Sequence, residues 1–340
     1  MSINPSTLRW LVRFLCLVLL GAIGYLGFSQ LYLPAKFKEV NKVEKALVFE
    51  IRKGEPLASV ANRLEQAGLI PDTFVFLKLL ERENLDTKIQ AGFFAFEGQE
   101  SLQEVAQKLL YGASKEIKLR IPEGFNAKQI DKLLTERGLI EAGAFRKLVQ
   151  TGLSDLPAIL STRVNQNLEG YLFPDTYFLR LQGFTSEVLV RKMLTALAKN
   201  LAAAGFQGSR SDLSLHEVLT LASIVELEEP NPRNKPLVAD ILLRRWKSGG
   251  LLGADATLFY VLGHRQNLTR QDLEVNSPYN TRKFWGLPPT PVCAPGLSSL
   301  QAVLNPQPNE FWYYLHDRTG QIHFGRNLAE HNRNKAEFLN

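Results

Sequence analysis

The chain has 340 residues, of which 45% are hydrophobic and 22% charged, and its formal net charge is +6 at pH 7. This length and apolar content predict about two folded domains and exclude a disordered chain. Lysine and arginine are interleaved with aspartate and glutamate, so the charge favours an anionic membrane surface or cell-wall polymer as partner and argues against nucleic-acid binding.

The first predicted element is a membrane-spanning helix over residues 14–33, FLCLVLLGAIGYLGFSQLYL, which carry no charge. At about 1.5 Å per helical residue, such a run spans roughly 30 Å, the thickness of the hydrocarbon core of a bilayer. A cleaved signal peptide is the alternative, but no small-x-small cleavage site follows, and Cys16 lies too early to be a lipoprotein cysteine. We expect an uncleaved, single-pass anchor in the cytoplasmic (inner) membrane, preceded by a short cytoplasmic tail, residues 1–13.

An internal repeat follows a charged linker over residues 34–46. VFEIRKGEPLASVANRLEQAGLI, which starts at Val48, aligns without gaps with KLRIPEGFNAKQIDKLLTERGLI, which starts at Lys118. Each copy reads as a strand, a glycine turn and a helix that ends at a glycine. We predict a small strand-helix module over residues 47–115, a small-residue break in YGASKE, and a main domain over residues 116–340 that the second copy opens.

The stretch NLEGYLFPDTYFL, residues 167–179, contains a carboxylic acid inside an aromatic run. If this run is extended, the two-residue period places Glu169, Tyr171 and Phe173 on one face. Rings beside a carboxyl exclude water and favour its neutral form, which is how a general acid stays protonated near neutral pH. The alternative interpretation is an exposed glutamate on an edge strand that ends at Pro174.

A second carboxyl follows in SLHEVLTLASIVELEE, a helix that begins with a capping box formed by Ser214 and Glu217. The apolar stripe of this helix continues into Glu226, which stands four residues after Ala222 and seven after Leu219. The helix should therefore bury the Glu226 carboxyl, either against a lysine or arginine partner or in a functional site.

The last third of the chain contains a long loop, SPYNTRKFWGLPPTPVCAPG, that is dense in proline and glycine. Its Asn280 and Thr281 could hydrogen-bond a ligand or serve turn geometry alone. A hairpin that turns at DRTG and a helix capped at Asn327 end the chain. No metal-ligand spacing, Walker sequence or dinucleotide fingerprint is present, so we expect neither metal nor cofactor. Two cysteines, Cys16 and Cys293, imply no disulfide framework.

These motifs occur in a recognisable order. With Glu169 inside LEGYLFPDTY and Glu226 inside ASIVE, followed by SPYNT, GLPP and a terminal H-x-F…EHN, the chain resembles the endolytic murein transglycosylases, the YceG-like family. The resemblance runs from the anchor to the C-terminus. It implies an α+β protein with a single N-terminal transmembrane helix, a small LysM-like module and a larger mixed α/β catalytic domain outside the membrane.

The same resemblance implies a reaction. Glu169 would protonate the oxygen that links N-acetylmuramic acid to N-acetylglucosamine and then, as a carboxylate, take a proton from the C6 hydroxyl of the muramic acid. That hydroxyl attacks C1 and leaves a 1,6-anhydro end, so no water is required. The implied partners are peptidoglycan glycan strands, whose nascent length the enzyme would limit, the membrane, and peptidoglycan synthases. The residues expected to bind substrate are Tyr171, Phe173, Asp175, Glu226, Asp255, Asn280 and Thr281.

Several positions depart from the family pattern. Leu227 stands where a lysine usually follows the ASIVE glutamate, and Arg282 stands where an aromatic residue often follows Y-N-T. Asp255 and Thr257 of the family's Q-[ST]-D-P-T run remain, while the glutamine, the serine or threonine, and the proline are replaced by Gly253, Ala254 and Ala256. These changes leave the carboxylates in place but alter residues expected to contact the glycan.

Two other functions therefore stay open at this point. The chain could be an anchored wall-binding protein without activity, although the intact Glu169 argues against this. It could also be a hydrolytic muramidase, with Glu226 or Asp175 as the second carboxylate that such an enzyme needs to activate water. The muropeptides released from a digest distinguish the three functions by anhydro ends, reducing ends or no release.

We predict that residues 34–340 lie on the wall side of the membrane. Arg9 and Arg13 precede the span and several lysines follow it, so the positive-inside count does not decide the orientation, and this placement follows from the implied function. Protease added to spheroplasts should remove the large domain and leave the anchor in the membrane. Full protection of the domain, with the anchor intact, would show that the orientation is reversed.

Overall fold

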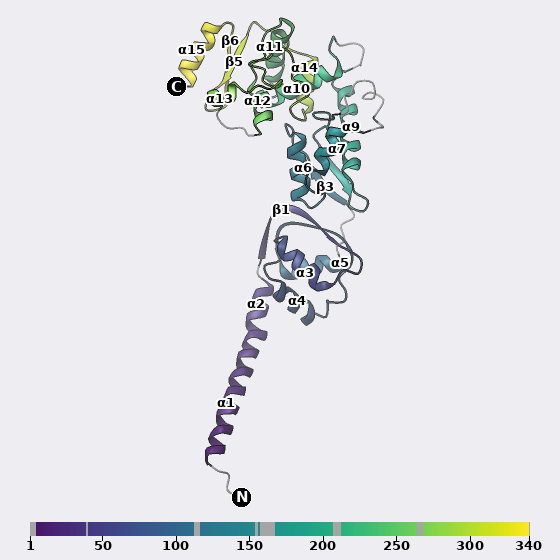
Figure 1. Cartoon of the computed structure of the whole chain (residues 1–340), viewed down its shortest axis with the longest axis vertical. Helices are drawn as coiled ribbons and strands as arrows, with labels where there is room; N and C mark the ends of the chain where they lie inside the picture. The colour runs from purple at the N-terminus through teal and green to yellow at the C-terminus, as the bar shows by residue number, and fades with distance from the viewer. Residues whose placement is uncertain are drawn as a thin grey trace. The chain divides into compact units, whose positions relative to one another are not determined.

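The structure, a computed structural model, divides into two compact units (Figure 1). The first unit comprises residues 1–117, 136–139 and 180–183, and the second comprises the remainder of the chain. The expected mixed α/β architecture is confirmed, whereas most of the expected YGASKE break, residues 112–115, lies outside the described residues. The structure describes residues 5–38, 40–111, 116–153, 156, 167–206, 212–263 and 268–339.

The first unit begins with a continuous helical segment formed by α1 (Pro5–Gly27), the π-helical turn η1 (Phe28–Tyr32) and α2 (Leu33–Phe37). Within the described chain, Arg13–Phe37 is the one helix long and apolar enough to cross a membrane. Its large apolar side chains are exposed before Leu33, which with Phe37 packs into the core of the unit. By length and composition, this segment is consistent with a membrane anchor or a signal sequence.

After this helix, the chain of the first unit forms a two-stranded sheet and three further helices. β1 (Val40–Ile51) pairs antiparallel with β2 (Gly92–Ser101), with an irregular register between Val43 and Leu47. Phenylalanine side chains from the helices and from the sheet pack in one core, which includes Phe76, Phe94 and Phe96. The helices are α3 (Leu57–Gln66), α4 (Thr73–Arg82) and α5 (Leu102–Tyr111).

The internal repeat is confirmed as two strand-turn-helix copies. The first copy is the end of β1 followed by α3, and the second is β3 (Glu116–Arg120) followed by α6 (Ala127–Glu136). Gly68 and Gly138 follow the two helices with φ angles of +70° and +67°, which only glycine adopts without strain. The sequence similarity between the copies therefore reflects the same local backbone.

The second unit contains two small sheets among many helices. β3 pairs with β4 (Thr176–Arg180), and β5 (Tyr313–His316) forms an antiparallel hairpin with β6 (Ile322–Gly325). Besides α6, its helices are α7 (Ala144–Thr151), α9 (Ser186–Ala203), α10 (Leu215–Glu228), α11 (Lys235–Lys247), α12 (Asp255–Leu262), α13 (Arg270–Leu273), α14 (Leu297–Leu304) and α15 (Leu328–Phe338).

Helix α10 forms the centre of the second unit. The expected Ser214–Glu217 capping box is present at its start, and the helix packs against α11, α12 and α14. Residues 218–225 are all buried, and the hydroxyls of Thr220 and Ser223 donate to main-chain carbonyls within the helix. A helix that is apolar on every side must be surrounded, so its last turn lies deep in the unit and carries Glu226 and Glu228 there.

The expected strand over residues 167–173 is wrong. Glu169 and Gly170 form a turn, and the strand of this region, β4, begins only at Thr176. Gly170 has a φ angle of +76°, in the left-handed region, which breaks the two-residue alternation on which the expectation depended.

Candidate active site

Glu169 lies at the tip of a turn that other parts of the chain enclose. Gly170, which follows it, packs against Pro291 so closely that a β-carbon at this position would overlap the proline ring. The Glu169 main-chain N–H donates to the side-chain oxygen of Asn167 at 3.0 Å, which fixes the start of the turn. The Glu169 residue is only 7% exposed, so this turn delivers a carboxyl into a mostly enclosed position.

Two donors from distant helices hold the Glu169 carboxyl. The main-chain N–H of Ala127, the first residue of α6, donates to Oε1 at 3.0 Å. The Tyr260 hydroxyl, on α12, donates to Oε2 at a longer 3.3 Å. Asn126 and Gln129 cap the start of α6 by exchanging side chain-to-main chain bonds of 2.9 Å, so the Ala127 N–H points outward from a fixed helix end.

Burial raises the pKa of Glu169 to about 7. Loss of water around the charged form is the largest cause, and it outweighs the Ala127 and Tyr260 hydrogen bonds and the nearby Arg146 charge, which lower the pKa. Near neutral pH the carboxyl is therefore divided between its neutral and charged forms. A group in this state can both donate and accept a proton without a large cost in either direction.

A cleft of about 820 Å³ opens beside Glu169. Its cations come from Lys128 and Lys132 on α6 and from Arg146 on α7, and Tyr260 lies on its α12 side. Among the described residues that line it, Glu169 is the only carboxyl, and several neighbours carry amides that can bond to hydroxyl groups. The amide-bearing residues are Asn126, Gln129, Gln150 and Asn167. The cleft thus combines one carboxyl that titrates near neutral pH with walls of basic and amide side chains.

The side chain of Glu226 is also mostly buried, but it forms an ion pair. Its Oε2 atom receives the Lys235 Nζ at 3.1 Å, the Gly296 N–H at 3.0 Å and the Ser299 hydroxyl at 2.7 Å. The side chains of Lys235 and Glu226 are only 2% and 9% exposed. A further carboxyl, Glu123, packs against Gly296, and burial followed by the Glu226 charge raises the pKa of Glu123. This cluster therefore resembles an internal support more than a reacting group.

Known proteins with similar sequence and fold identify the family of this chain. The YceG-like family model matches residues 49–337. The chain belongs to the YceG-like family. It is 29% identical over 355 aligned residues to the endolytic murein transglycosylase of Streptococcus pneumoniae serotype 2 (strain D39 / NCTC 7466), an alignment that covers 95% of this chain and 64% of that protein.

Two further YceG-like relatives match over most of their length. The endolytic murein transglycosylase of Bacillus subtilis (strain 168) is 28% identical over 332 residues, which cover 92% of this chain and 91% of that protein. The crystal structure of a YceG-like protein from Listeria monocytogenes matches with a TM-score of 0.58 and 27% identity, covering 85% of this chain and 99% of that one. The fold described above is therefore the YceG-like fold.

Three of the expected substrate-binding residues lie away from the cleft of this YceG-like protein. Tyr171 and Phe173 are buried in the core, where the Tyr171 hydroxyl bonds to His216 at 2.9 Å. The main-chain oxygen of Phe173 receives the Tyr177 hydroxyl at 2.6 Å. Asp175 is exposed, and its carboxyl accepts from the Thr176 N–H. None of the three lines the cleft beside Glu169.

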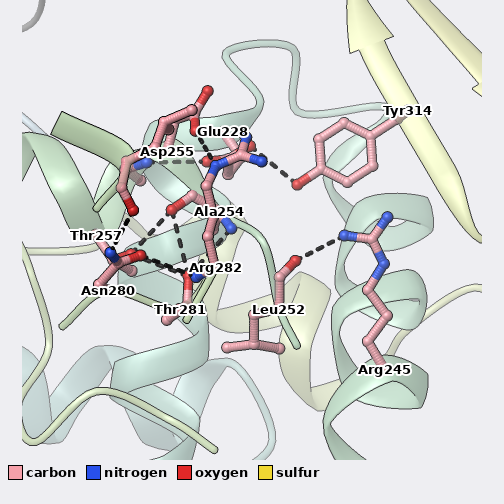
Figure 2. Close-up of polar contacts among 12 residues, drawn as sticks. Glu228, Arg245, Leu252, Ala254, Asp255, Thr257, Asn280, Thr281, Arg282 and Tyr314 are labelled. Atoms are coloured by element: carbon pink, nitrogen blue, oxygen red, sulfur yellow. Dashed lines mark hydrogen bonds and ion pairs between the residues drawn. The ribbon is translucent and has the colours of Figure 1, made fainter. Parts of the chain in front are cut away.

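Asn280 and Thr281 are buried and occupied by bonds within the unit (Figure 2). The Asn280 amide donates to the carbonyls of Leu273 and Val275, each at 2.9 Å. The Thr281 hydroxyl lies 3.0 Å from the Thr257 hydroxyl and accepts from the Ala254 N–H. These contacts match the turn-geometry interpretation of the SPYNT motif. Asp255, the remaining expected residue, pairs with Arg282 at 2.6 Å at the first turn of α12.

Sequence reasoning missed most of the groups that surround Glu169. Tyr260 lies 91 residues further along the chain, in a helix whose pattern is simply apolar, and no motif marks it. Ala127 acts through its main chain, so its side chain carries no signal. The one usable clue was the cap at Asn126, because a capped helix end exposes N–H groups that attract a carboxyl.

Glu169→Gln should increase stability at high pH. The pKa of Glu169 lies above its ordinary value of 4.5, so its neutral form contributes stability that is complete below about pH 4.5 and is lost as the pH rises through 7. Glutamine keeps the neutral state at every pH, and the variant should gain about 2–3 kcal/mol in unfolding free energy at pH 8 and little at pH 4.5. Urea unfolding at both values measures this, with exposed Asp175→Asn as control. An equal gain at both would contradict the assigned pKa.

Glu226→Gln should destabilise the second unit, because it leaves the buried Lys235 ammonium without its ion-pair partner. Removing one partner of a buried pair typically costs about 3–5 kcal/mol. The matched control is Glu274→Gln, whose pair with Lys283 is exposed and should contribute less than about 1 kcal/mol. Denaturant unfolding compares the two, and adding Lys235→Met to Glu226→Gln should recover part of the loss. Equal small effects of both single variants would argue against the support role.

Proposed function

We propose that this protein is an endolytic murein transglycosylase that cleaves the bond between N-acetylmuramic acid and N-acetylglucosamine in peptidoglycan strands and leaves 1,6-anhydro ends. The observation that carries the proposal is Glu169, a buried carboxyl with a pKa of about 7 in a cleft of glycan-binding chemistry. The pneumococcal and Bacillus relatives are named endolytic murein transglycosylases, which agrees with it. Because the chain spans 64% of the length of the pneumococcal protein, the activity of this chain is a proposal.

The hydrogen bonds of Glu169 suit an acid that later acts as a base. The Ala127 N–H bonds to Oε1 at 3.0 Å, whereas the Tyr260 hydroxyl bonds to Oε2 at a longer 3.3 Å, so we assign the proton exchange to Oε2. In the first step the neutral acid protonates the leaving glycosidic oxygen. In the second step the carboxylate takes the proton of the C6 hydroxyl, which attacks C1 of the same sugar. A pKa near 7 serves both steps at neutral pH.

The surroundings of Glu169 favour this reaction over hydrolysis by two carboxylates. A muramidase of the usual kind requires a second carboxyl at the reacting carbon. Glu226 is engaged by Lys235, Gly296 and Ser299, and the exposed Asp175 does not line the cleft. Among the described lining residues there is no other carboxyl. An internal hydroxyl nucleophile needs no such group, because its position within the substrate replaces the activation of water.

The proposal includes a place in the cell. A helix over residues 14–33 would anchor the enzyme once in the cytoplasmic membrane, with residues 34–340 on the wall side. The strand-helix module, residues 47–115, would be LysM-like and hold glycan, and residues 116–340 would cut it. Such an enzyme would limit the length of nascent strands next to the peptidoglycan synthases that make them. The support for this placement is the apolar N-terminal helix and the cationic cleft.

A digest of purified peptidoglycan with the full-length protein tests the proposal. Mass analysis should find muropeptides with 1,6-anhydro ends. Glu169→Gln should lower their release by at least about 10²–10⁴-fold, because glutamine keeps the size of the acid but cannot transfer a proton. The matched control is Asp175→Asn, which changes an exposed carboxyl of the same motif and should keep wild-type release.

Each other outcome has a defined meaning. Products with reducing ends would identify a hydrolytic muramidase, and no release by the folded wild-type protein would identify a wall-binding protein. Wild-type release by Glu169→Gln, or loss of release in a folded Asp175→Asn variant, would show that the acid has been assigned wrongly.

A further inference from the structure

A second cleft, of about 650 Å³, lies in the same unit at the opposite end of α12. The last turn of α12, with Tyr260, lines the catalytic cleft, whereas Asp255 at its first turn lines the second one. The eight residues of α12 make a helix about 12 Å long, which sets the scale of the separation. The mechanism proposed above uses no residue of this second cleft.

Two positive charges of this cleft have no carboxylate partner among the described residues. Arg245 of α11 donates to the main-chain oxygen of Leu252 at 2.7 Å (Figure 2). It also donates to the main-chain oxygen of Trp312, and its guanidinium lies 5.5 Å from the ring centre of Tyr313. These bonds fix the guanidinium but leave its charge uncompensated. Lys335 of α15 lines the same cleft, is exposed, and forms no ion pair within the described chain.

The acidic groups of the cleft do not cancel this charge. Asp255 is matched by Arg282, which also lines the cleft, at 2.6 Å. Glu228 accepts the Ala256 N–H at 3.1 Å and the Tyr314 hydroxyl at 2.9 Å, and burial raises its pKa, which favours its neutral form (Figure 2). The net charge that remains is positive.

The surroundings of His331 are separate evidence for the positive charge of this cleft. It lies one helical turn before Lys335 on α15, stacks on Tyr313 with ring centres 5.1 Å apart, and lines the cleft. Burial is the largest cause that lowers the pKa of His331, and the charges of Lys335 and Arg245 lower it further. The other histidine of the cleft, His316, is paired with Glu229. An anion bound between Lys335 and Arg245 would offset their charges and raise the pKa of His331.

Apart from Leu227, which lines the catalytic cleft, the positions at which the sequence departs from its family pattern lie at this second cleft. Gly253 and Arg282 line the cleft, and the main-chain N–H groups of Ala254 and Ala256 donate to Thr281 and Glu228 directly behind it. Gly253 lacks a side chain, and Arg282 adds the cation that neutralises Asp255. In this chain, therefore, Gly253 leaves space in the second cleft, and Arg282 compensates the negative charge of Asp255.

We propose that the second cleft binds a carboxylate of the peptide side chains carried by the polymer whose glycan enters the catalytic cleft. Lys335 and Arg245 attract the carboxylate, and the partly exposed Trp312 ring offers an apolar surface to the adjoining peptide. This inference rests on the proposed function. Its consequence is that the enzyme recognises peptide-bearing strands at a point about one helix length from the bond that it cuts.

Binding to the full-length Glu169→Gln protein tests the inference, because this variant does not cut and binding is then measured apart from catalysis. The probes are a disaccharide-tetrapeptide muropeptide, the same fragment with its carboxyls amidated, and inorganic phosphate. Calorimetry should give roughly tenfold weaker binding after amidation, the usual effect of one lost charge-assisted hydrogen bond. Lys335→Gln should weaken binding of the charged fragment by a similar factor and leave the amidated fragment unaffected.

Two further measurements separate this site from general charge attraction. Lys199→Gln, which changes an exposed lysine of α9 outside both clefts, should leave binding unchanged. The histidine NMR signal of His331 should titrate at higher pH with the charged fragment than without it. Insensitivity to amidation, an equal loss in Lys199→Gln, or an equal His331 response to phosphate would overturn the assignment. Anhydro-muropeptide release by the wild-type protein together with such a result would overturn this inference alone and leave the proposed function standing.

Discussion

Contact between a glutamate carboxyl and the N-terminus of a helix organises the second unit. Glu169 accepts from the first N–H of α6, Glu226 from the residue that caps α14, and Glu228 from the first turn of α12. The N-terminus of a helix carries unpaired N–H groups and a partial positive charge, so each carboxyl satisfies donors that would otherwise be buried without a partner. Three helices are thereby fixed in position.

The same contact has different consequences because the surroundings differ. Glu226 also meets the Lys235 ammonium, so its charge is compensated and the pair serves as an internal support. Glu169 accepts hydrogen bonds from neutral donors, among them the Ala127 N–H and the Tyr260 hydroxyl, and loss of water dominates its pKa. Carboxyls of the same unit thus take different roles according to whether a buried ammonium bonds to them.

Local patterns predicted the parts of the fold that depend on neighbouring residues. The capping box at Ser214, the cap at Asn327 and the repeated strand-turn-helix units all depend on residues a few positions apart, and each is present. The C-terminal hairpin follows from its turn in the same way.

The unpredicted parts depend on distant contacts. The strand expected through Glu169 became a turn, because Gly170 adopts a left-handed backbone and the aromatic side chains beyond it enter the core instead of the cleft. Glu169 could be recognised as a candidate acid from its motif, but Tyr260 and the Ala127 N–H could not, since only folding brings them to it. Asn280 and Thr281 looked available for ligand, yet the fold uses their polar atoms internally.

The packing of Gly170 against Pro291 constrains two segments that are distant in the sequence. No side chain fits at position 170 while the loop through Pro291 keeps its path, and the left-handed backbone there independently favours glycine. A substitution in one segment is therefore acceptable only after the other has moved. The position of the candidate acid thus depends on a loop more than 100 residues further along the chain, and a change in the path of that loop would shift the Glu169 carboxyl in its cleft.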